Sequence, residues 1–179
     1  SDLLKFEKRG HIAIIILNNP PANTWTAQSL NELKSIIAEL NADRENYSLI
    51  IGSDSEKFFS AGADLNHFNH NDKAKALAFS QAFGEAFEAL ANYQGVSIAA
   101  ITGFAMGGGL EVALSCDVRI CEQQAQMALP EASVGLLPCG LGSQQLSWLV
   151  GEGWAKRIIL LGERIKAEQA EKIGLVSEV

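Results

Sequence analysis

The segment that decides the fold reads Gly103-Phe104-Ala105-Met106-Gly107-Gly108-Gly109-Leu110-Glu111 (GFAMGGGLE). It follows an apolar, β-branched run at residues 96–101 (VSIAAI) and continues into residues 110–114 (LEVAL), which are helical in character. A strand therefore leads directly into three consecutive glycines and a helix. Because glycine is costly in regular structure, the triplet indicates either a tight, closely packed turn or the close approach of a ligand to the backbone.

The triplet also places unpaired N–H groups at the start of a helix, where the macrodipole favours negative charge. Phosphate is the usual ligand of such a position. However, the Lys-Ser/Thr pair of a P-loop and the G-x-G-x-x-G spacing are both absent from the sequence. The other ligand is an oxyanion, such as a thioester oxygen that gains charge as an enolate or tetrahedral intermediate forms. A packed turn without a ligand explains the triplet equally well.

Outward from this segment, short apolar runs alternate with helical patterns. We expect helices at residues 26–40, 72–92, 110–114, 143–161 and 166–173, and strands at residues 11–17, 47–52, 96–101, 118–121 and 127–129. The alternation predicts an α/β fold with largely parallel strands, in a single domain over residues 1–179. The apolar face of the second helix comprises Leu77, Phe79, Phe83, Phe87 and Leu90.

Composition excludes several classes of function. The net charge of −7, from 14 basic and 21 acidic residues, leaves no basic surface for nucleic acid. No apolar run approaches the length needed to span a bilayer. Cys116, Cys121 and Cys139 fit no close zinc-ligand spacing, so we expect free thiols in a reducing compartment. The predicted location is the cytoplasm, or the mitochondrial matrix of a eukaryote, with neither nucleic acid nor membrane as a partner.

A second segment rich in small residues reads Phe59-Ser60-Ala61-Gly62-Ala63-Asp64-Leu65. Small side chains in a row leave the backbone accessible, so this segment could supply a second N–H donor. A flexible loop of small residues is the alternative interpretation.

Two glutamates are candidates for proton transfer. Glu111 lies in the first turn of the helix after the glycines, where an acid is also favourable for the helix dipole alone. Glu131 follows Leu129-Pro130 within an otherwise apolar stretch, and apolar surroundings raise the pKa of a carboxyl group. An exposed loop position is the alternative for Glu131.

The histidines and serines indicate no further site. His67 and His70 are three residues apart in a polar stretch, and His11 precedes a strand, so a metal site is not expected. The G-x-S-x-G elbow of a serine hydrolase is absent, and Ser60 has no evident histidine partner.

Taken together, four ordered segments resemble the enoyl-CoA hydratase/isomerase (crotonase) superfamily. They are residues 18–23 (NNPPAN), 59–65 (FSAGADL), 103–111 (GFAMGGGLE) and 129–131 (LPE), the last followed by residues 135–138 (GLLP). The resemblance implies a crotonase-like fold, a spiral of ββα units. It also implies an acyl-CoA thioester as substrate, with no other cofactor and no metal.

The resemblance further assigns roles by motif position. Two backbone N–H groups, those of Ala63 and Gly108, are expected to stabilise an enolate-like intermediate. Glu111 is expected to orient and deprotonate a water, and Glu131 to deliver a proton to Cα. The implied activity is that of an enoyl-CoA hydratase, the syn addition of water to a trans-2-enoyl-CoA to give a 3-hydroxyacyl-CoA. The implied binding residues are Ala22, Lys57 (for the CoA phosphates), Ala61, Gly62, Ala63, Asp64, Leu65, Gly107, Gly108, Pro130 and Gly135.

The sequence departs from the family pattern in two places. After Pro138 it reads Cys139-Gly140-Leu141-Gly142-Ser143-Gln144-Gln145, where relatives often have a glycine-rich stretch and a Gln-Arg pair. Because this segment borders the acyl end of the pocket in relatives, the acyl preference stays open. Residues 174–179 (GLVSEV) are typical of the start of a strand, so we expect that a C-terminal helical region is missing here. In the complete chain that region implies a homotrimer or a dimer of trimers.

Other activities within the resemblance also stay open. An enoyl-CoA Δ-isomerase needs a single acid, and a thioester hydrolase or decarboxylase could use the same oxyanion hole. An RNA-binding or non-catalytic homologue is the alternative outside enzymes, and the negative net charge counts against it.

Overall fold

The computed structural model describes residues 2–68 and 72–179. A first sheet has five strands in the order β1-β2-β3-β5-β7. Its strands are β1 (Leu4–Arg9), β2 (Ile12–Leu17), β3 (Ser48–Ser53), β5 (Val96–Ile101) and β7 (Val118–Cys121). Only β1 and β2 pair antiparallel; the other neighbours in this sheet are parallel. The predicted α/β fold with largely parallel pairing is confirmed.

A second, smaller sheet has the order β4-β6-β8-β9. Its strands are β4 (Phe58–Ser60), β6 (Phe104–Met106), β8 (Gln126–Ala128) and β9 (Ile165–Lys166). The pairs β4–β6 and β6–β8 are parallel, and β8–β9 is antiparallel. Each of β3, β5 and β7 is followed in the chain by a strand of this second sheet, and then by a helix. The chain therefore repeats a ββα unit, with one strand of each unit in each sheet.

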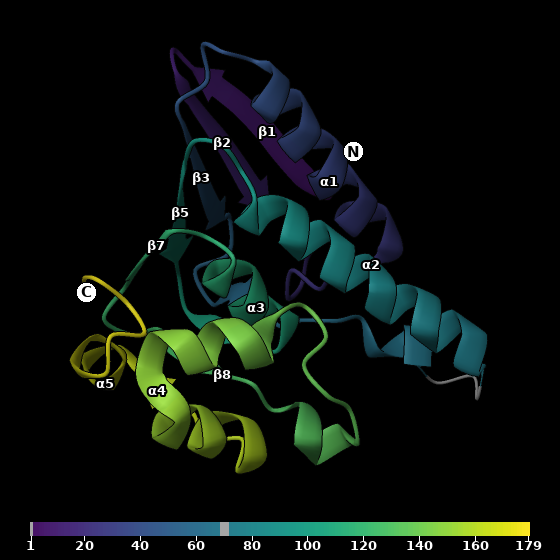
Figure 1. Cartoon of the computed structure of the whole chain (residues 1–179), viewed down its shortest axis with the longest axis vertical. Helices are drawn as coiled ribbons and strands as arrows, with labels where there is room; N and C mark the ends of the chain where they lie inside the picture. The colour runs from purple at the N-terminus through teal and green to yellow at the C-terminus, as the bar shows by residue number, and fades with distance from the viewer. Residues whose placement is uncertain (1, 69–71) are drawn as a thin grey trace.

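The helices are α1 (Ala27–Ala42), α2 (Lys73–Ala91), α3 (Gly108–Leu114), α4 (Gly142–Leu160) and α5 (Ala167–Lys172), with short 3₁₀ turns η1 (Leu65–Phe68) and η2 (Glu131–Val134). Figure 1 shows α1 and α2 side by side next to the first sheet, with α3 between α2 and α4. None of the helices that the structure describes is both long and apolar enough to cross a membrane.

Local sequence signals explain where the two long helices begin. The Thr26 side chain accepts from the Ser29 N–H, and the Ser29 side chain accepts from the Thr26 N–H, which forms a capping box for α1. The Asp72 side chain accepts from the N–H groups of Ala74 and Lys75 at the start of α2. Capping of this kind satisfies N–H groups that the first helical turn leaves without partners.

A column of aromatic rings runs along α2 into the core. Phe79, Phe83 and Phe87 lie four residues apart, and their successive ring centroids are 5.1 and 5.5 Å apart in edge-to-face contacts. Trp25 continues the column, 5.5 Å from Phe87. Phe68 of η1 begins it, 5.4 Å from Phe79. We call these five residues the aromatic column; it joins the core to the site described below.

Several features differ from the sequence expectations. The structure adds β1 and the short strands β4, β6 and β9, which have six, three, three and two residues. Leu77 belongs to no core face: it is 59% exposed. Residues 174–179 make a single bridge, between Ile120 and Glu178, and form no strand in the described chain. The predicted loop at residues 66–71 begins as η1, and its residues 69–71, including His70, lie outside the described residues.

Candidate active site

A cavity of about 700 Å³ lies where the first turn of α3 meets residues 61–65, the N-terminal half of α2 and residues 130–139. Its walls are mainly apolar, with a few polar groups, as is usual for small-molecule sites. The sequence-predicted site residues that line it are Ala61, Ala63, Asp64, Leu65, Gly107, Gly108, Glu111, Pro130, Glu131 and Gly135. The structure therefore brings together the two small-residue segments and both candidate acids.

Three predicted binding residues lie outside the cavity wall. The Ala22 carbonyl accepts from the Ala61 N–H at 2.9 Å, so Ala22 supports the wall from behind. Gly62 is buried beneath the same segment. The Lys57 ammonium lies 5.3 Å from the centre of the Phe58 ring. A role of Lys57 toward the CoA phosphates stays a prediction.

Gly62 explains why residues 61–65 can lie against α3. Its φ is +90°, a backbone conformation that residues other than glycine rarely adopt. A Cβ at this position would lie 2.7 Å from the Met106 carbonyl oxygen and 3.1 Å from the Gly108 nitrogen. The two segments are thus in close backbone contact. The sequence predicts their accessibility but not this contact.

The N–H group of Ala63 is turned away from its neighbouring segment. Trp25 forms a parallel bridge with Ala63, and the bonds on either side are made by the Gly62 carbonyl and the Asp64 N–H. Because N–H groups alternate along extended chain, the Ala63 N–H points away from Trp25. Ala63 also lines the cavity.

Each residue of the glycine triplet has its own structural reason. Gly107 has φ +54°, and its N–H donates to the Ala128 carbonyl at 2.9 Å. Gly109 packs on the Ser60 carbonyl with no room for a Cβ. Gly108 is the first residue of α3, so its N–H has no carbonyl of a preceding helical turn to donate to. The close packing that the sequence allowed is present, and binding of an oxyanion by the Gly108 N–H stays a prediction.

Glu111 is buried at the inner wall of the cavity, with 1% of its surface exposed. Its Oε1 accepts from the N–H groups of Gly140 at 2.8 Å and Gly142 at 2.9 Å. Burial, followed by the charge of Glu131, raises the pKa of Glu111 to about 7, while N–H groups of the 139–142 backbone act to lower it. Burial outweighs the hydrogen bonds because the ionised form loses its water.

Glu131 is the first residue of η2 and faces the same cavity. Its Oε2 is buried, and no hydrogen-bond partner reaches it from the described residues. Burial raises the pKa of Glu131 above its ordinary value. The burial of Oε2 agrees with the interpretation of a carboxyl group in apolar surroundings, and the role of Glu131 in proton transfer stays a prediction.

One wall of the cavity comes from α2, which the sequence analysis did not assign to the site. Ala76, Leu77, Ser80 and Phe83 line it from one side of α2. Their spacing of three and four residues was visible, but it is equally typical of a core-facing stripe. Cys139, from the segment that departs from the family pattern, also lines the cavity.

The three cysteines are free, as predicted. Burial raises the pKa of Cys116 to about 12 and the pKa values of Cys121 and Cys139 to about 11. All three thiols are therefore protonated at neutral pH, which disfavours a nucleophilic role for Cys139. Within residues 2–68 and 72–179, no group of three or more His, Cys, Asp or Glu residues could hold a metal ion.

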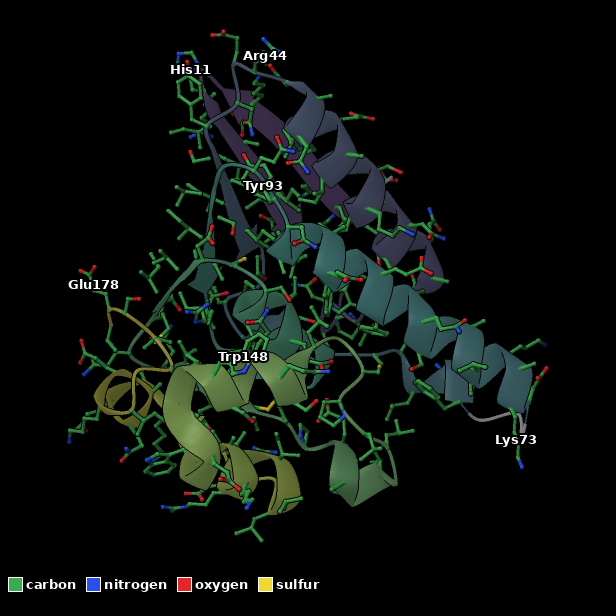
Figure 2. The ribbon with its side chains drawn as sticks, viewed as in Figure 1. His11, Arg44, Lys73, Tyr93, Trp148 and Glu178 are labelled. Carbon is green, nitrogen blue, oxygen red and sulfur yellow. The ribbon has the colours of Figure 1, made fainter. Side chains whose placement is uncertain are left out.

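The side chains of Ser60 and His11 make contacts outside the cavity. The Ser60 hydroxyl donates to the Asn23 carbonyl at 2.7 Å and accepts from the Gly62 N–H at 3.1 Å. His11 stacks on Tyr47, with ring centroids 4.3 Å apart. Figure 2 places His11 beside Arg44, at the end of the molecule opposite Lys73 at the tip of α2.

Comparisons with known proteins agree with this geometry. The sequence model of the enoyl-CoA hydratase/isomerase family matches residues 7–179. A short-chain-enoyl-CoA hydratase of Clostridium acetobutylicum is 38% identical over 174 residues, which cover 97% of this chain and 67% of that protein. A crotonyl-CoA hydratase of Syntrophomonas wolfei is 35% identical, with the same coverage of both chains. The chain spans about two thirds of the length of the curated relatives it matches.

Solved structures show the same fold. DspI of Pseudomonas aeruginosa is 60% identical with a TM-score of 0.98, and the match covers 100% of this chain and 73% of that one. An enoyl-CoA hydratase from Bacillus anthracis is 32% identical with a TM-score of 0.94, covering 99% of this chain and 69% of that one.

Proposed function

The chain belongs to the enoyl-CoA hydratase/isomerase family, and from that premise we propose that it adds water to trans-2-enoyl-CoA thioesters to give 3-hydroxyacyl-CoA. The observation that carries the proposal is that two acids with raised pKa values, the buried Glu111 and the half-buried Glu131, line one cavity together with Ala63 and Gly108. Isomerisation needs only one acid, so the second acid favours hydration over the isomerase alternative.

The N–H groups of Ala63 and Gly108 bind the thioester oxygen in this proposal. When water adds to Cβ, negative charge develops on that oxygen, and hydrogen bonds that strengthen with the charge lower the barrier. The close approach of Gly62 to the Gly108 nitrogen, which the absence of a side chain at residue 62 permits, supports the assignment because it brings the two segments together. Losing one such donor costs roughly 3 kcal/mol of transition-state stabilisation in comparable sites.

The acids hold the water that reacts. Glu111 takes a proton from the water as its oxygen bonds to Cβ, and Glu131 gives a proton to Cα. The bond that breaks is the Cα–Cβ π bond, and no proton is gained or lost overall. The charge of Glu131 raises the pKa of Glu111, so the pair titrates as a coupled unit. The reactive form carries one proton shared across the two acids.

Binding of the CoA portion by residues 61–65, with Lys57 near the phosphates, is part of the proposal. The names of relatives in Clostridium acetobutylicum and Syntrophomonas wolfei make crotonyl-CoA a suitable first substrate. Assembly as a trimer or a dimer of trimers, in the cytoplasm, belongs to the same proposal.

The experiment that tests it is crotonyl-CoA turnover, measured as loss of enoyl absorbance with identification of the product. We expect loss of absorbance and formation of 3-hydroxybutyryl-CoA. Calorimetry with a saturated acyl-CoA measures binding separately. Binding without hydration would contradict the proposal and make 3-enoyl-CoA isomerisation the next activity to assay.

A further inference from the structure

A four-residue turn, Cys139–Gly142, contacts the carboxyl group of Glu111. We call it the Glu111 turn. The N–H groups of Gly140 and Gly142 both donate to the same atom, Oε1 of Glu111, at 2.8 and 2.9 Å. The turn is also where the sequence departs from the family pattern, and the proposed hydration mechanism gives it no role.

The geometry of the turn explains how two N–H groups reach one oxygen. Leu141, between the two glycines, has φ +70° and ψ +4°, in the left-handed region. A left-handed residue between others turns successive N–H groups toward one side, which forms a concave site for an anion. Leucine rarely adopts this conformation, so the surrounding structure must hold it in place.

Both glycines are required by the space around Glu111. A Cβ at Gly142 would lie 2.6 Å from Oε1 and 2.9 Å from Cγ of Glu111. A Cβ at Gly140 would collide with the Phe87 ring and lie 2.9 Å from Oε2 of Glu111. The backbone of the turn can approach the carboxyl group only because neither position carries a side chain.

The two hydrogen bonds distinguish the two carboxyl oxygens of Glu111. Oε1 accepts from both glycines of the turn, and a further backbone hydrogen bond from Cys139 reaches the same carboxyl group. Oε2 is left as the oxygen available to a molecule in the cavity.

We propose that the Glu111 turn is a positioning element, in which the N–H groups of Gly140 and Gly142 hold Oε1 so that Oε2 alone receives the proton of the reacting water. The proposal rests on the proposed hydration, and it names the part of the chain that orients the base. Gly140 and Gly142 act through Glu111 and do not touch the substrate.

The groups that face Glu111 determine how its pKa would change if an N–H donor were lost. The titratable groups near it are Glu131 of η2, which raises its pKa, and the Cys139 thiol of the turn. The N–H groups are the features that lower the pKa. Removing one of them therefore raises the pKa of Glu111 further and frees the carboxyl to rotate.

Gly142→Ala is the first test, with Gly153→Ala as its matched control. Gly153 lies in the same helix, α4, and a Cβ there meets nothing within 4 Å. We expect Gly142→Ala to lower kcat for crotonyl-CoA by roughly tenfold or more, the order expected for one hydrogen bond to a charged group, with KM changed far less. The acidic limb of its pH–rate profile moves to higher pH. Gly153→Ala leaves both unchanged.

A second measurement needs no substrate. The carboxyl carbon of Glu111, labelled with ¹³C and assigned by comparison with Glu111→Gln, reports its titration directly by NMR. We expect a higher pKa in Gly142→Ala and no change in Gly153→Ala. An unchanged titration of Glu111 in Gly142→Ala would overturn the proposal. A shifted titration in a chain that does not hydrate crotonyl-CoA would refute hydration and leave the contact intact.

A third chain separates the donor from the added bulk. Replacing the Gly142 amide by an ester deletes the N–H and adds no atom that could disturb the fold. The titration of Glu111 should move upward as in Gly142→Ala. If the ester leaves the titration unchanged, the N–H does not position the acid, whatever Gly142→Ala does.

Discussion

The ring of Phe83 lies directly against the backbone of Gly108: a Cβ at residue 108 would be 2.6 Å from Cε1 of that ring. One contact thus joins α2 to the first residue of α3, beside the N–H proposed to bind the thioester oxygen. Phe83 has 1% of its surface exposed and lies in the middle of the aromatic column, so it has little freedom to move. The position of Gly108 is therefore set by the core.

Gly108→Ala should reduce both stability and turnover. The added methyl group overpacks a buried contact, which costs about 1–3 kcal/mol of unfolding free energy, and displaces the N–H. The double variant Gly108→Ala, Phe83→Leu replaces the ring by a smaller side chain, which makes room for the added methyl group. It should recover part of the turnover, because the N–H of residue 108 is still present. Urea unfolding and crotonyl-CoA turnover measure the two effects. Equal turnover in the single and double variants would show that Phe83 does not set the position of Gly108.

Glu131→Gln should lower kcat for crotonyl-CoA by about 10²–10⁴, the usual contribution of a positioned acid or base. The amide has nearly the same shape but cannot give a proton to Cα, so saturated acyl-CoA should bind as before. The control is Glu152→Gln, an exposed acid paired with Lys156 on α4. That pair is worth little, and its loss should leave turnover unchanged. Hydration that survives in Glu131→Gln removes this residue from the mechanism.

The rate of hydration should depend on pH through Glu111. Burial and the charge of Glu131 raise the pKa of Glu111 to about 7, and a base must be ionised to accept a proton. The value of kcat should therefore fall below pH 7, by roughly tenfold per pH unit where one proton controls the step. A profile measured with crotonyl-CoA from about pH 5 to about pH 9 checks this. A flat acidic side would mean that Glu111 is not the base.

The same ionisation should destabilise the fold as the pH rises. In the folded chain, Glu111 keeps its proton up to about pH 7. In the unfolded chain, the same carboxyl group loses its proton near the ordinary pKa of 4.5. Between these values the folded chain binds more protons, so the free energy of unfolding falls with increasing pH. The raised pKa corresponds to about 3 kcal/mol.

The comparison with Glu111→Gln isolates this effect, because the amide does not ionise. Urea unfolding of both chains, between about pH 5 and about pH 8, should show the variant gaining about 3 kcal/mol relative to the parent. Glu131 is present in both chains, so most of the change belongs to Glu111. A difference that does not vary with pH would contradict the burial of an ionisable group at this position.

Leu77→Ala should affect binding more than stability. Leu77 is 59% exposed and lines the cavity, so its truncation should change the free energy of unfolding by no more than about 0.5 kcal/mol. Leu90, on the same helix, has 1% of its surface exposed, and Leu90→Ala should cost about 2–5 kcal/mol. Urea unfolding of the two variants and calorimetry with acyl-CoA distinguish the roles. Similar losses of stability in Leu77→Ala and Leu90→Ala would show that Leu77 contributes to the core.

Periodicity and glycine placement predict much of this molecule, and their limits have physical causes. The run at residues 96–101 and the helix at 72–92 were visible because apolar spacing is repeated often enough to define a period. Strands β4, β6 and β9 have only two or three residues, too few for any period. These strands form because they pair with one another in the second sheet, although they lie far apart in the sequence. This pairing depends on the whole fold.

The site shows the same division. Glu111 and Glu131 were candidates because one follows the glycine triplet and the other lies in an apolar stretch, and the resemblance assigned their roles by motif position. The hydrogen bonds from Gly140 and Gly142 could not be predicted, because they join residues 29 and 31 positions from Glu111. The cavity wall on α2 was missed because spacing shows which residues share a helix face but not whether that face meets protein or a ligand.

The repeated ββα arrangement also bears on how the chain folds. Each of the three units adds one strand to each sheet, and β9 completes the second sheet well after β7 has completed the first. The cavity takes its walls from three successive units, at residues 61–83, 107–111 and 130–139. Contacts between distant segments form only after the intervening chain has been closed into loops. Glu111 and Glu131 come from different units, so they meet in one cavity only after those units have packed against each other.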